Sequence, residues 1–207
     1  MARWKANPKE RLARAALELF AERGYAATTV ADIVERADLT KSTFFRHFED
    51  KREVLFGGQE DLLAVLSQSV ADVPPGANTV AYVEALLDTL AARFDAEALD
   101  LAATRAAVIG GQPELRERDL LKRAQLEAAI HGALGARGVD HLTARLAAAM
   151  ALLSFDEALD RWVGGTRTNA FRHVLRRTLG ELVECAAALS EPASEACRAS
   201  RCTDAEF

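Results

Sequence analysis

The chain has 207 residues, a formal net charge of −5, 50% hydrophobic residues and 28% charged residues. This balance supports a packed core and excludes an intrinsically disordered chain. Alanine is abundant and aromatic residues make up only 6% of the sequence, which favours packed helices over sheets. The sequence contains no run of 18 apolar residues and therefore predicts no membrane-spanning helix.

The sequence predicts a cytoplasmic protein. No apolar segment follows the basic residues at the N-terminus, which argues against a secretory signal. Cys185, Cys197 and Cys202 are odd in number and lack CxxC spacing, so we expect reduced thiols. Neither a metal site nor a bound cofactor is expected.

Charge is unevenly distributed along the chain. Residues 1–52 contain 11 lysines and arginines against 8 acidic residues, whereas the rest of the chain is net acidic. A basic end on an acidic protein favours contact with a polyanion at that end alone.

The first predicted helix has a clear start and end. Asn7 is a suitable N-cap, Pro8 fits the first helical position, and Gly24 supplies the stop. The apolar residues that fall on one face of this helix are Leu12, Ala15, Ala16, Leu19 and Phe20.

Two short helices are predicted to follow. A Thr29-x-x-Asp32 pattern opens the first of them, and Thr40 caps the second, which runs from Lys41 to about His47. A tight break at Asp38 separates the two. Two short helices packed on a longer one predict a helix-turn-helix arrangement.

A fourth helix is predicted from Lys51 to about Val70, opened by a capping box from Asp50 to Glu53. Gly57 and Gly58 interrupt it. The glycine pair has two explanations, close helix packing or a hinge.

The remaining chain is a series of apolar helical patterns. The expected helices are 79–94, 96–109, Pro113 to about Gly132, 140–163 and 168–189. From Ser190 onward the sequence is polar and aperiodic, and we expect a frayed end.

The segment from Gly24 to Lys51 carries the most specific pattern. It reads GYAATTVADIVERADLTKSTFFRHFEDK and resembles the DNA-binding domain of the TetR family of bacterial transcriptional regulators. The resemblance implies an all-α homodimer, with a three-helix helix-turn-helix DNA-binding domain and a larger helical domain for effector binding and dimerisation. The expected parts are a DNA-binding domain at 1–52, a ligand-binding and dimerisation domain at 53–190, and a flexible tail at 191–207.

The resemblance places the third helix in the major groove of double-stranded DNA, where base edges are distinguishable. Candidate base contacts are Lys41, Ser42, Thr43 and Phe44. Phe44 has two open roles, a contact to a thymine methyl group or a partly buried core position.

Other residues are expected to hold phosphates. The candidates are Thr28, Thr29, His47 and Lys51, with Thr40 and Phe45 completing the DNA-binding set. For Thr29 and Lys51 the alternatives are simple capping and a solvated charge. Arg3, Trp4 and Lys5 are either an arm that reaches DNA or a disordered tail.

Two residues depart from the family pattern. Phe45 stands where the family usually has tyrosine, so a hydroxyl directed at phosphate is missing and that contact is in doubt. Asp38 stands where glycine is common, but aspartate tolerates the left-handed region better than most residues, so the turn should survive.

The resemblance also implies a homodimer through the last two helices. The stripe at 171–189 suits this task, and so does the row of Leu152, Phe155, Leu159 and Trp162, although each could instead face its own core. A second row is left over for dimerisation and consists of Leu142, Leu146, Met150 and Leu153. Recognition helices one turn of DNA apart would lie about 34 Å from each other.

A small-molecule effector is implied in the helical body, which looks like that of family members that sense acyl-thioesters or other lipophilic molecules. Candidate lining residues are Phe94, Leu101, Arg105, Met150 and Phe155, with core packing as the alternative for the apolar ones. Arg105 lies in an apolar helix and needs a partner. We favour an internal salt bridge, to Asp156 or Glu157, over a contact with the effector.

These expectations describe a ligand-responsive repressor that binds a palindromic operator as a homodimer and is released by a small effector, through movement of the fourth helix. An enzyme is disfavoured, because the sequence lacks GxSxG, HExxH, phosphate-loop and Rossmann patterns. A second alternative is an orphan or protein-interaction member without specific DNA readout.

Overall fold

The structure, a computed structural model of the chain, describes residues 7–57, 59–94, 96–164 and 170–189. Outside these ranges lie the predicted tail at 191–207 and the residues Arg3, Trp4, Lys5, Gly58, Cys197 and Cys202. Within the described ranges every regular element is an α-helix, as the all-α fold class predicts. None of these helices is both long and apolar enough to cross a membrane.

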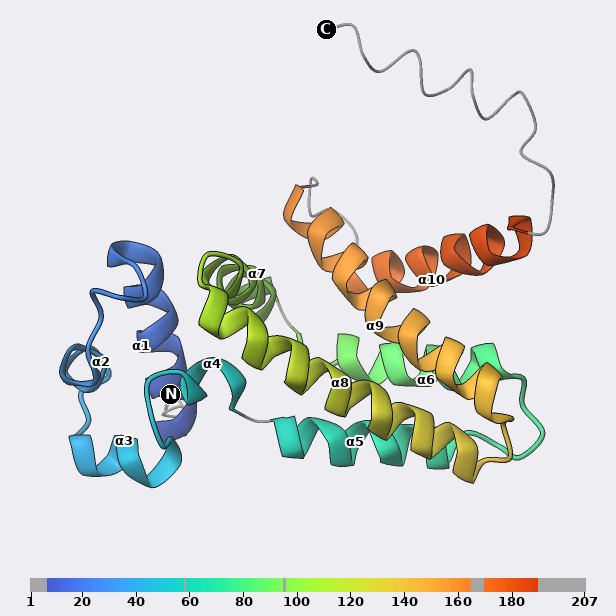
Figure 1. The fold of residues 1–207 in the computed structure, drawn as a ribbon, viewed down its shortest axis with the longest axis horizontal. Helices are drawn as coiled ribbons and strands as arrows, with labels where there is room; N and C mark the ends of the chain where they lie inside the picture. Colours follow the sequence, from blue (N-terminus) through green and yellow to red (C-terminus); the bar gives the residue numbers. More distant parts are fainter. Residues whose placement is uncertain (1–6, 58, 95, 165–169, 190–207) are drawn as a thin grey trace, which may run out of the picture.

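Four helices form the N-terminal part of the molecule, at the left of Figure 1. They are α1 (Pro8–Arg23), α2 (Val30–Arg36), α3 (Lys41–His47) and α4 (Glu53–Phe56). Both α2 and α3 pack against α1, which also contacts α4. The predicted helix-turn-helix arrangement is therefore present.

The predicted caps form, with one exception. Asn7 and Thr40 each accept a hydrogen bond from an amide in the first turn of their helix, at 3.1 Å. Asp50 accepts one from the Glu53 amide at 3.0 Å. Glu53 does not complete the predicted capping box, because its carboxylate pairs with Arg118 instead.

The turn between α2 and α3 passes through Asp38, whose φ of 51° lies in the left-handed region. The Leu39 amide closes the turn by donating to the Val34 carbonyl at 2.9 Å. Arg11 of α1 donates to the carbonyls of Ala37 and Asp38 at 2.5 and 3.3 Å. Aspartate tolerates this backbone conformation, and α1 holds the turn in place through Arg11.

The N-terminal helices enclose a core of their own. Its fully buried side chains include Leu12, Leu19, Ile33 and Phe44. Two further members, Ile109 and Leu115, come from α7 (Ala96–Gly110) and α8 (Pro113–Ala136). This N-terminal core is therefore closed by side chains from the rest of the chain.

The predicted fourth helix is interrupted at the glycine pair. α4 ends at Phe56, and α5 (Gln59–Asp72) starts two residues beyond Gly57. Gly57 has an extended backbone, and a Cβ placed there would lie 2.8 Å from Cε1 of the buried Phe48 ring. Close packing thus accounts for glycine at position 57, while the hinge stays a prediction.

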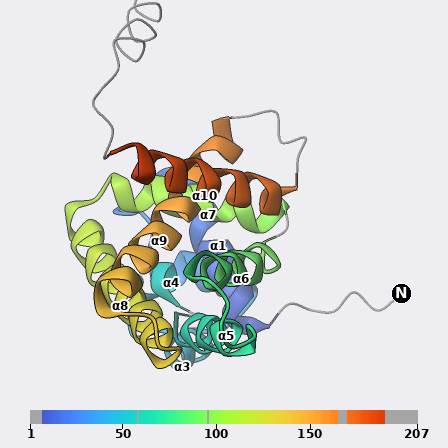
Figure 2. The ribbon, with the colours of Figure 1, turned by 90° about the vertical axis from the view of Figure 1, so that its right-hand side faces the viewer.

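The other helices build the body of the protein. Besides α5, α7 and α8, they are α6 (Thr79–Ala91), α9 (His141–Gly164) and α10 (Phe171–Ala188). α9 packs against α6, α8 and α10, and α5 packs against α6 and α8. Figure 2 shows α10 lying across the upper side of this bundle, over α6 and α9.

α8 is longer than predicted. It continues through Gly132 and Gly135 to Ala136, where the sequence predicts an end near Gly132. Ile130 and Leu134 are buried in the body. Their burial outweighs the cost of a glycine inside a helix, which is about 1 kcal/mol relative to alanine.

The apolar stripe on α10 divides into two parts. Phe171, Leu175 and Leu179 face the core of the body, whereas Val183 and Leu189 are exposed. The first part therefore belongs to the protomer's own core, which was the alternative for this stripe.

The two rows predicted on α9 lie on different faces. Leu152, Leu159 and Trp162 are buried in the core of the body, with Phe155 packed against it. Leu142, Leu146 and Leu153 of the second row are exposed, and Leu142 is 75% exposed. Met150, the fourth member of the second row, packs against the core of the body, so the three leucines are the part of this row that the protomer leaves uncovered.

Candidate nucleic-acid interface

Two adjacent aromatic side chains of α3 differ in burial, since Phe44 is buried and Phe45 is exposed. Phe44 is fully buried, and its ring contacts Phe48 and Phe45 with centroid distances of 5.5 and 5.4 Å. Phe44 is therefore a core residue, and the predicted contact of Phe44 with a thymine methyl group is wrong. Phe45 is instead the outward residue, with 57% of its surface exposed.

The exposed face of α3 carries the groups that a base-reading helix needs. Lys41, Ser42 and Arg46 are exposed, and Thr43 is half-buried. Arg46 was not among the predicted contacts. Its position four residues after Ser42 places it on the same helical face, and this spacing is visible in the sequence.

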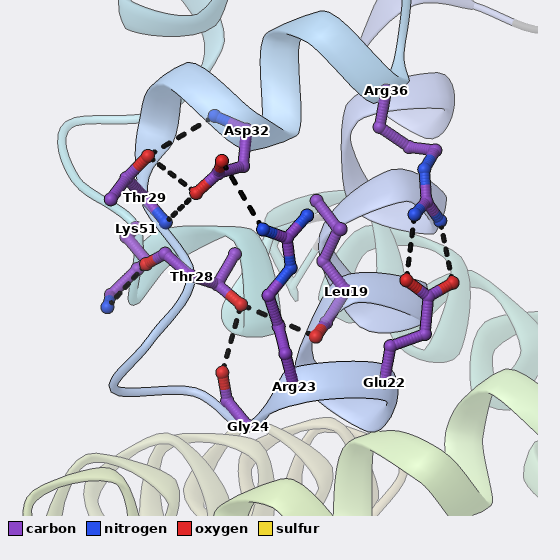
Figure 3. Close-up of polar contacts among 9 residues, drawn as sticks. All are labelled: Leu19, Glu22, Arg23, Gly24, Thr28, Thr29, Asp32, Arg36 and Lys51. Carbon is purple, nitrogen blue, oxygen red and sulfur yellow. Dashed lines mark hydrogen bonds and ion pairs between the residues drawn. The ribbon is translucent and has the colours of Figure 1, made fainter.

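Thr28 and Thr29 differ in what their hydroxyls do (Figure 3). Thr28 is buried, and its hydroxyl donates to the Gly24 carbonyl at 2.9 Å. Thr29 is exposed and forms a complete capping box with Asp32, accepting from its amide at 3.2 Å. The buried hydroxyl of Thr28 serves packing, so its predicted phosphate role is not supported by its position.

The Thr29 hydroxyl and amide both donate to the Asp32 carboxylate at 2.7 Å. These hydrogen bonds hold the pKa of the Asp32 carboxyl below its usual value, and Arg23, 3.4 Å away, acts in the same direction. The Asp32 carboxylate in the capping box at the start of α2 is therefore ionised.

Lys51 turns inward to the loop that precedes α2. Its ammonium group donates to the carbonyls of Tyr25 and Thr28 at 2.8 and 2.9 Å. The same group lies 4.2 Å from the centroid of the Tyr25 ring. Lys51 thereby links the segment before α4 to the loop before α2. This internal role differs from both predicted roles of Lys51, a phosphate contact and a solvated charge.

Two residues of the predicted DNA-binding set, Thr40 and the expected phosphate residue His47, lie at opposite ends of α3. Thr40 is exposed at the start, and its hydroxyl lies 3.0 Å from that of Thr43. His47 is half-buried in the last turn, and its Nε2 is buried without a hydrogen-bond partner. The orientation of Thr40 is compatible with a phosphate contact.

Ion pairs join α1 to α2. Arg36 donates to both carboxylate oxygens of Glu22, at 2.8 and 2.7 Å (Figure 3). It also pairs with Glu18 at 3.3 Å. The hydrogen bonds from Arg36 lower the pKa of the Glu22 carboxyl. Much of the positive charge of residues 1–52 is therefore paired inside the N-terminal region, which leaves Lys41 and Arg46 as the exposed cations of α3.

Arg105 lies at the junction between α4 and the body. It pairs with Asp119 at 3.1 Å and donates to the Leu55 carbonyl, and its guanidinium carbon lies 5.3 Å from the centroid of the Phe56 ring. Burial lowers the pKa of the Arg105 guanidinium, and Asp119 opposes that shift. The favoured internal salt bridge is present.

The partner predicted for Arg105 was wrong. Asp156 pairs with Arg123, and Glu157 pairs with Arg161 at 3.0 Å. Both acids are on α9, whereas Arg105 faces α4 and α8. Sequence spacing within α7 cannot specify which neighbouring helix supplies the acid.

Arg118 of α8 makes a second contact with α4. It pairs with Glu53, and its guanidinium carbon lies 5.9 Å from the centroid of the Phe56 ring. Phe56 therefore contacts arginines from both α7 and α8. The junction formed by Glu53, Phe56, Arg105 and Arg118 is called the α4 clamp below.

The predicted effector residues do not form one group. Phe94 and Phe155 stack with a centroid distance of 5.5 Å, and Met150 packs on the same core of the body. Leu101 instead packs against the N-terminal core.

Two aromatic residues that the effector prediction did not include join this stack. Phe171 lies 5.9 Å from Phe155 and 5.8 Å from Trp162 between ring centroids. The indole nitrogen of Trp162 is buried without a hydrogen-bond partner. Their apolar periodicity was visible in the sequence, but it was attributed to dimerisation.

A hollow of about 410 Å³ lies between the α1–α2 turn and the end of α7. It is lined by Phe20, Ala21, Gly24, Tyr25, Thr104, Ala107, Val108, Gly111 and Gln112. None of the predicted effector residues lines it. In the described ranges, no three histidine, cysteine, aspartate or glutamate side chains gather where a metal ion could bind.

A family profile described as "Bacterial regulatory proteins, tetR family" matches residues 12–57. The HTH-type transcriptional repressor DhaR of Mycobacterium sp. strain GP1 is 34% identical over 90 residues, covering 40% of this chain and 44% of that protein. The HTH-type transcriptional repressor KstR2 of Rhodococcus jostii strain RHA1 is 35% identical over 96 residues, covering 44% and 46%. The matched stretch spans less than half the length of either relative.

Solved structures match over a longer range. The TetR family repressor FadR of Thermus thermophilus, in complex with lauroyl-CoA, is 28% identical, covers 85% of this chain and 93% of that one, and has a TM-score of 0.54. FadR of Bacillus subtilis, in complex with stearoyl-CoA, has a TM-score of 0.62 over 84% and 97% of the two chains. At 20% identity, this second likeness supports the fold alone.

Proposed function

Since the chain belongs to the TetR family of bacterial regulatory proteins, we propose that it is a cytoplasmic, ligand-responsive transcriptional repressor. It binds a palindromic operator in double-stranded DNA as a homodimer, and a small-molecule effector releases it. The observation that carries this proposal is the outward face of α3, where Lys41, Ser42, Phe45 and Arg46 are exposed together.

The exposed face of α3 supplies the base contacts. Lys41 reaches the acceptors on guanine, while Ser42 adapts as donor or acceptor. Arg46 is suited to guanine or to phosphate, since guanidinium groups bind both with paired hydrogen bonds. The N-terminal core fixes the direction of this face through the buried ring of Phe44.

The backbone contacts come from residues that flank α3. The hydroxyls of Thr40 and Thr43 and the ring of His47 lie at its two ends and hold phosphates. Thr29 and Lys51 support these contacts indirectly, because their hydrogen bonds hold the start of α2 and the loop before it in place. Phosphate contacts of this kind set the register on the duplex without reading sequence.

The direction of regulation follows from the relatives. DhaR and KstR2 are both HTH-type transcriptional repressors, and each resembles this chain over 90 or more residues. A repressor blocks transcription by occupying its operator, so the protein needs only tight, releasable DNA binding.

The homodimer forms through the last two helices. The uncovered row of Leu142, Leu146 and Leu153 on α9 supplies the apolar surface, and Val183 and Leu189 extend it on α10. Exposed apolar rows of this kind are typical of subunit interfaces. Pairing places two copies of α3 about 34 Å apart, the spacing of successive major grooves.

The effector binds in the body and acts through the α4 clamp. Support comes from the FadR complexes with lauroyl-CoA and stearoyl-CoA, and from the aromatic stack beside the unpaired indole nitrogen of Trp162. Movement of α7 or α8 would pull Arg105 or Arg118 and so displace α4. For release, the effector must bind the conformation with displaced α4 more tightly than the DNA-binding conformation, by a few kcal/mol.

Selection of bound duplexes from a random DNA pool tests the proposal. We expect one palindromic motif with half-sites about 10 base pairs apart. Affinity for this motif should exceed affinity for random DNA at least 1,000-fold at physiological salt, and it should fall steeply as salt rises. The protein should bind as a dimer in sedimentation measurements.

A pair of variants locates the interface. Lys41→Ala should weaken operator binding about tenfold or more, whereas the matched change Arg93→Ala, at an exposed position in the body, should leave it unchanged. Equal affinity for the selected motif and random DNA would instead identify an orphan or protein-interaction member. Binding of a single protomer to the selected motif would contradict the proposed homodimer.

A further inference from the structure

The exposure of Phe45 is unusual for its residue type. Of the phenylalanines in the described part of the chain, Phe45 is the only one that is exposed; Phe44 and Phe48 beside it are buried. A phenyl ring in water is unfavourable because apolar surface is poorly hydrated. Contact of this ring with an apolar group outside the protomer would therefore be favourable.

The ring is held in one direction. It meets Phe44 edge to face, with an interplanar angle of 81°. Phe44 in turn contacts Phe48 and has no exposed surface. Since the supporting ring is locked in the core, Phe45 projects from α3 as a fixed feature of the surface.

The surroundings of Phe45 indicate the kind of partner. Lys41 and Ser42 lie four and three residues before it, and Arg46 directly follows it, all exposed. A phenyl ring with a cation and a hydroxyl on the same helical face, and a second exposed cation at the next position, suits a polyanion that also presents an apolar group. In a duplex the major groove offers one such group, the 5-methyl group of thymine.

We propose that Phe45 packs its ring against the methyl group of a thymine in each operator half-site and thereby selects thymine at that position. This inference rests on the proposed DNA-binding function and assigns part of its specificity. Phe45 lacks a hydroxyl and cannot donate a hydrogen bond to phosphate, so discrimination comes from the methyl contact.

Removal of single methyl groups from the DNA tests the proposal. In the selected operator, each thymine and its symmetry mate are replaced by deoxyuridine, which deletes the 5-methyl group and keeps base pairing. For the intact protein, one thymine pair should show a loss of roughly fourfold per half-site, about fifteenfold over both. The Phe45→Ala variant should bind the thymine and deoxyuridine duplexes with equal affinity.

Two further variants separate the ring from its neighbours. Phe45→Tyr keeps the ring and should keep the deoxyuridine effect. Lys41→Ala should weaken binding to both duplexes while leaving the ratio of their affinities unchanged. Circular dichroism should show native helix content for Phe45→Ala, because the side chain it removes is largely exposed.

Either of two results overturns the assignment. Sequence-specific binding without a deoxyuridine effect at any thymine excludes methyl readout, and an effect that persists undiminished in Phe45→Ala excludes Phe45 as the reader. Both differ from failure of the proposed function itself, in which no sequence is preferred over random DNA.

Discussion

The N-terminal core and the core of the body use different side chains to pack their helices. In the N-terminal core, the rings of Phe20, Phe44, Phe48 and Phe56 pack among aliphatic side chains. In the body, small residues recur along α9, at positions 144, 147, 148, 151 and 158, between long helices. Close-packed rings leave few alternative arrangements in a small space, and Phe44 anchors α3 in this core through its contact with Phe48.

The difference also shows how the two regions are joined. The N-terminal core takes Ile109 and Leu115 from the body, and the α4 clamp adds charged contacts around Phe56. The core beneath the proposed DNA-binding face is therefore completed by side chains of α7 and α8.

The largest expected effect concerns Leu115. Leu115→Ala deletes a fully buried side chain and should destabilise the protein by about 2–5 kcal/mol. Although Leu115 is in α8, the change should speed hydrogen exchange in α1–α4, because the cavity opens in the N-terminal core. The matched change Leu175→Ala, in the core of the body, should instead speed exchange in α6, α9 and α10. Identical exchange patterns for the two variants would remove the distinction between the cores.

A smaller effect is expected at the α4 clamp. A double-mutant cycle with Glu53→Gln and Arg118→Met should give a coupling energy of about 1 kcal/mol in urea unfolding, since both side chains are partly buried. The exposed pair Arg177–Glu181 within α10 serves as the control and should couple more weakly. A coupling near zero would show that the Glu53–Arg118 pair does not contribute, and would leave the contacts of Arg105, Phe56 and the N-terminal core to join α4 to the body.

The smallest effect at neutral pH concerns Tyr25. Burial raises the pKa of Tyr25 to about 12, with a further contribution from Glu114, whose negative charge disfavours the phenolate. The folded state thus holds this proton more tightly than the unfolded state, so stability is unaffected below about pH 10 and falls as pH rises from 10 to 12. Absorbance at high pH should show one late-titrating tyrosine that is missing in Tyr25→Phe. If the signal lost in Tyr25→Phe titrates near pH 10 instead, Tyr25 is not shielded by the core.

Local signals predicted the N-terminal elements well. The capping residues Asn7, Thr29 and Thr40 each mark the start of the helix that forms, because a cap is a contact between residues two or three apart. The turn at Asp38 follows from the same short-range chemistry. All of these contacts join residues that are close together in the sequence.

The site was predicted less completely. A helix of seven residues makes barely two turns, so apolar spacing did not distinguish which of Phe44 and Phe45 is buried. Lys51 was expected to hold a phosphate or to face solvent, and Arg105 was expected to pair with an acid of α9. Their actual partners lie 14 to 50 residues away in the chain, where local sequence patterns do not reach.

The amino-acid order alone determined the all-helical fold, the caps and the identity of the DNA-reading segment, since these depend on neighbouring residues. Only tertiary packing decided that Phe45 faces outward, that Lys51 faces inward and that Leu115 of the body closes the N-terminal core. Such choices depend on which distant surfaces meet, because burial and ion pairing are settled between helices rather than within them.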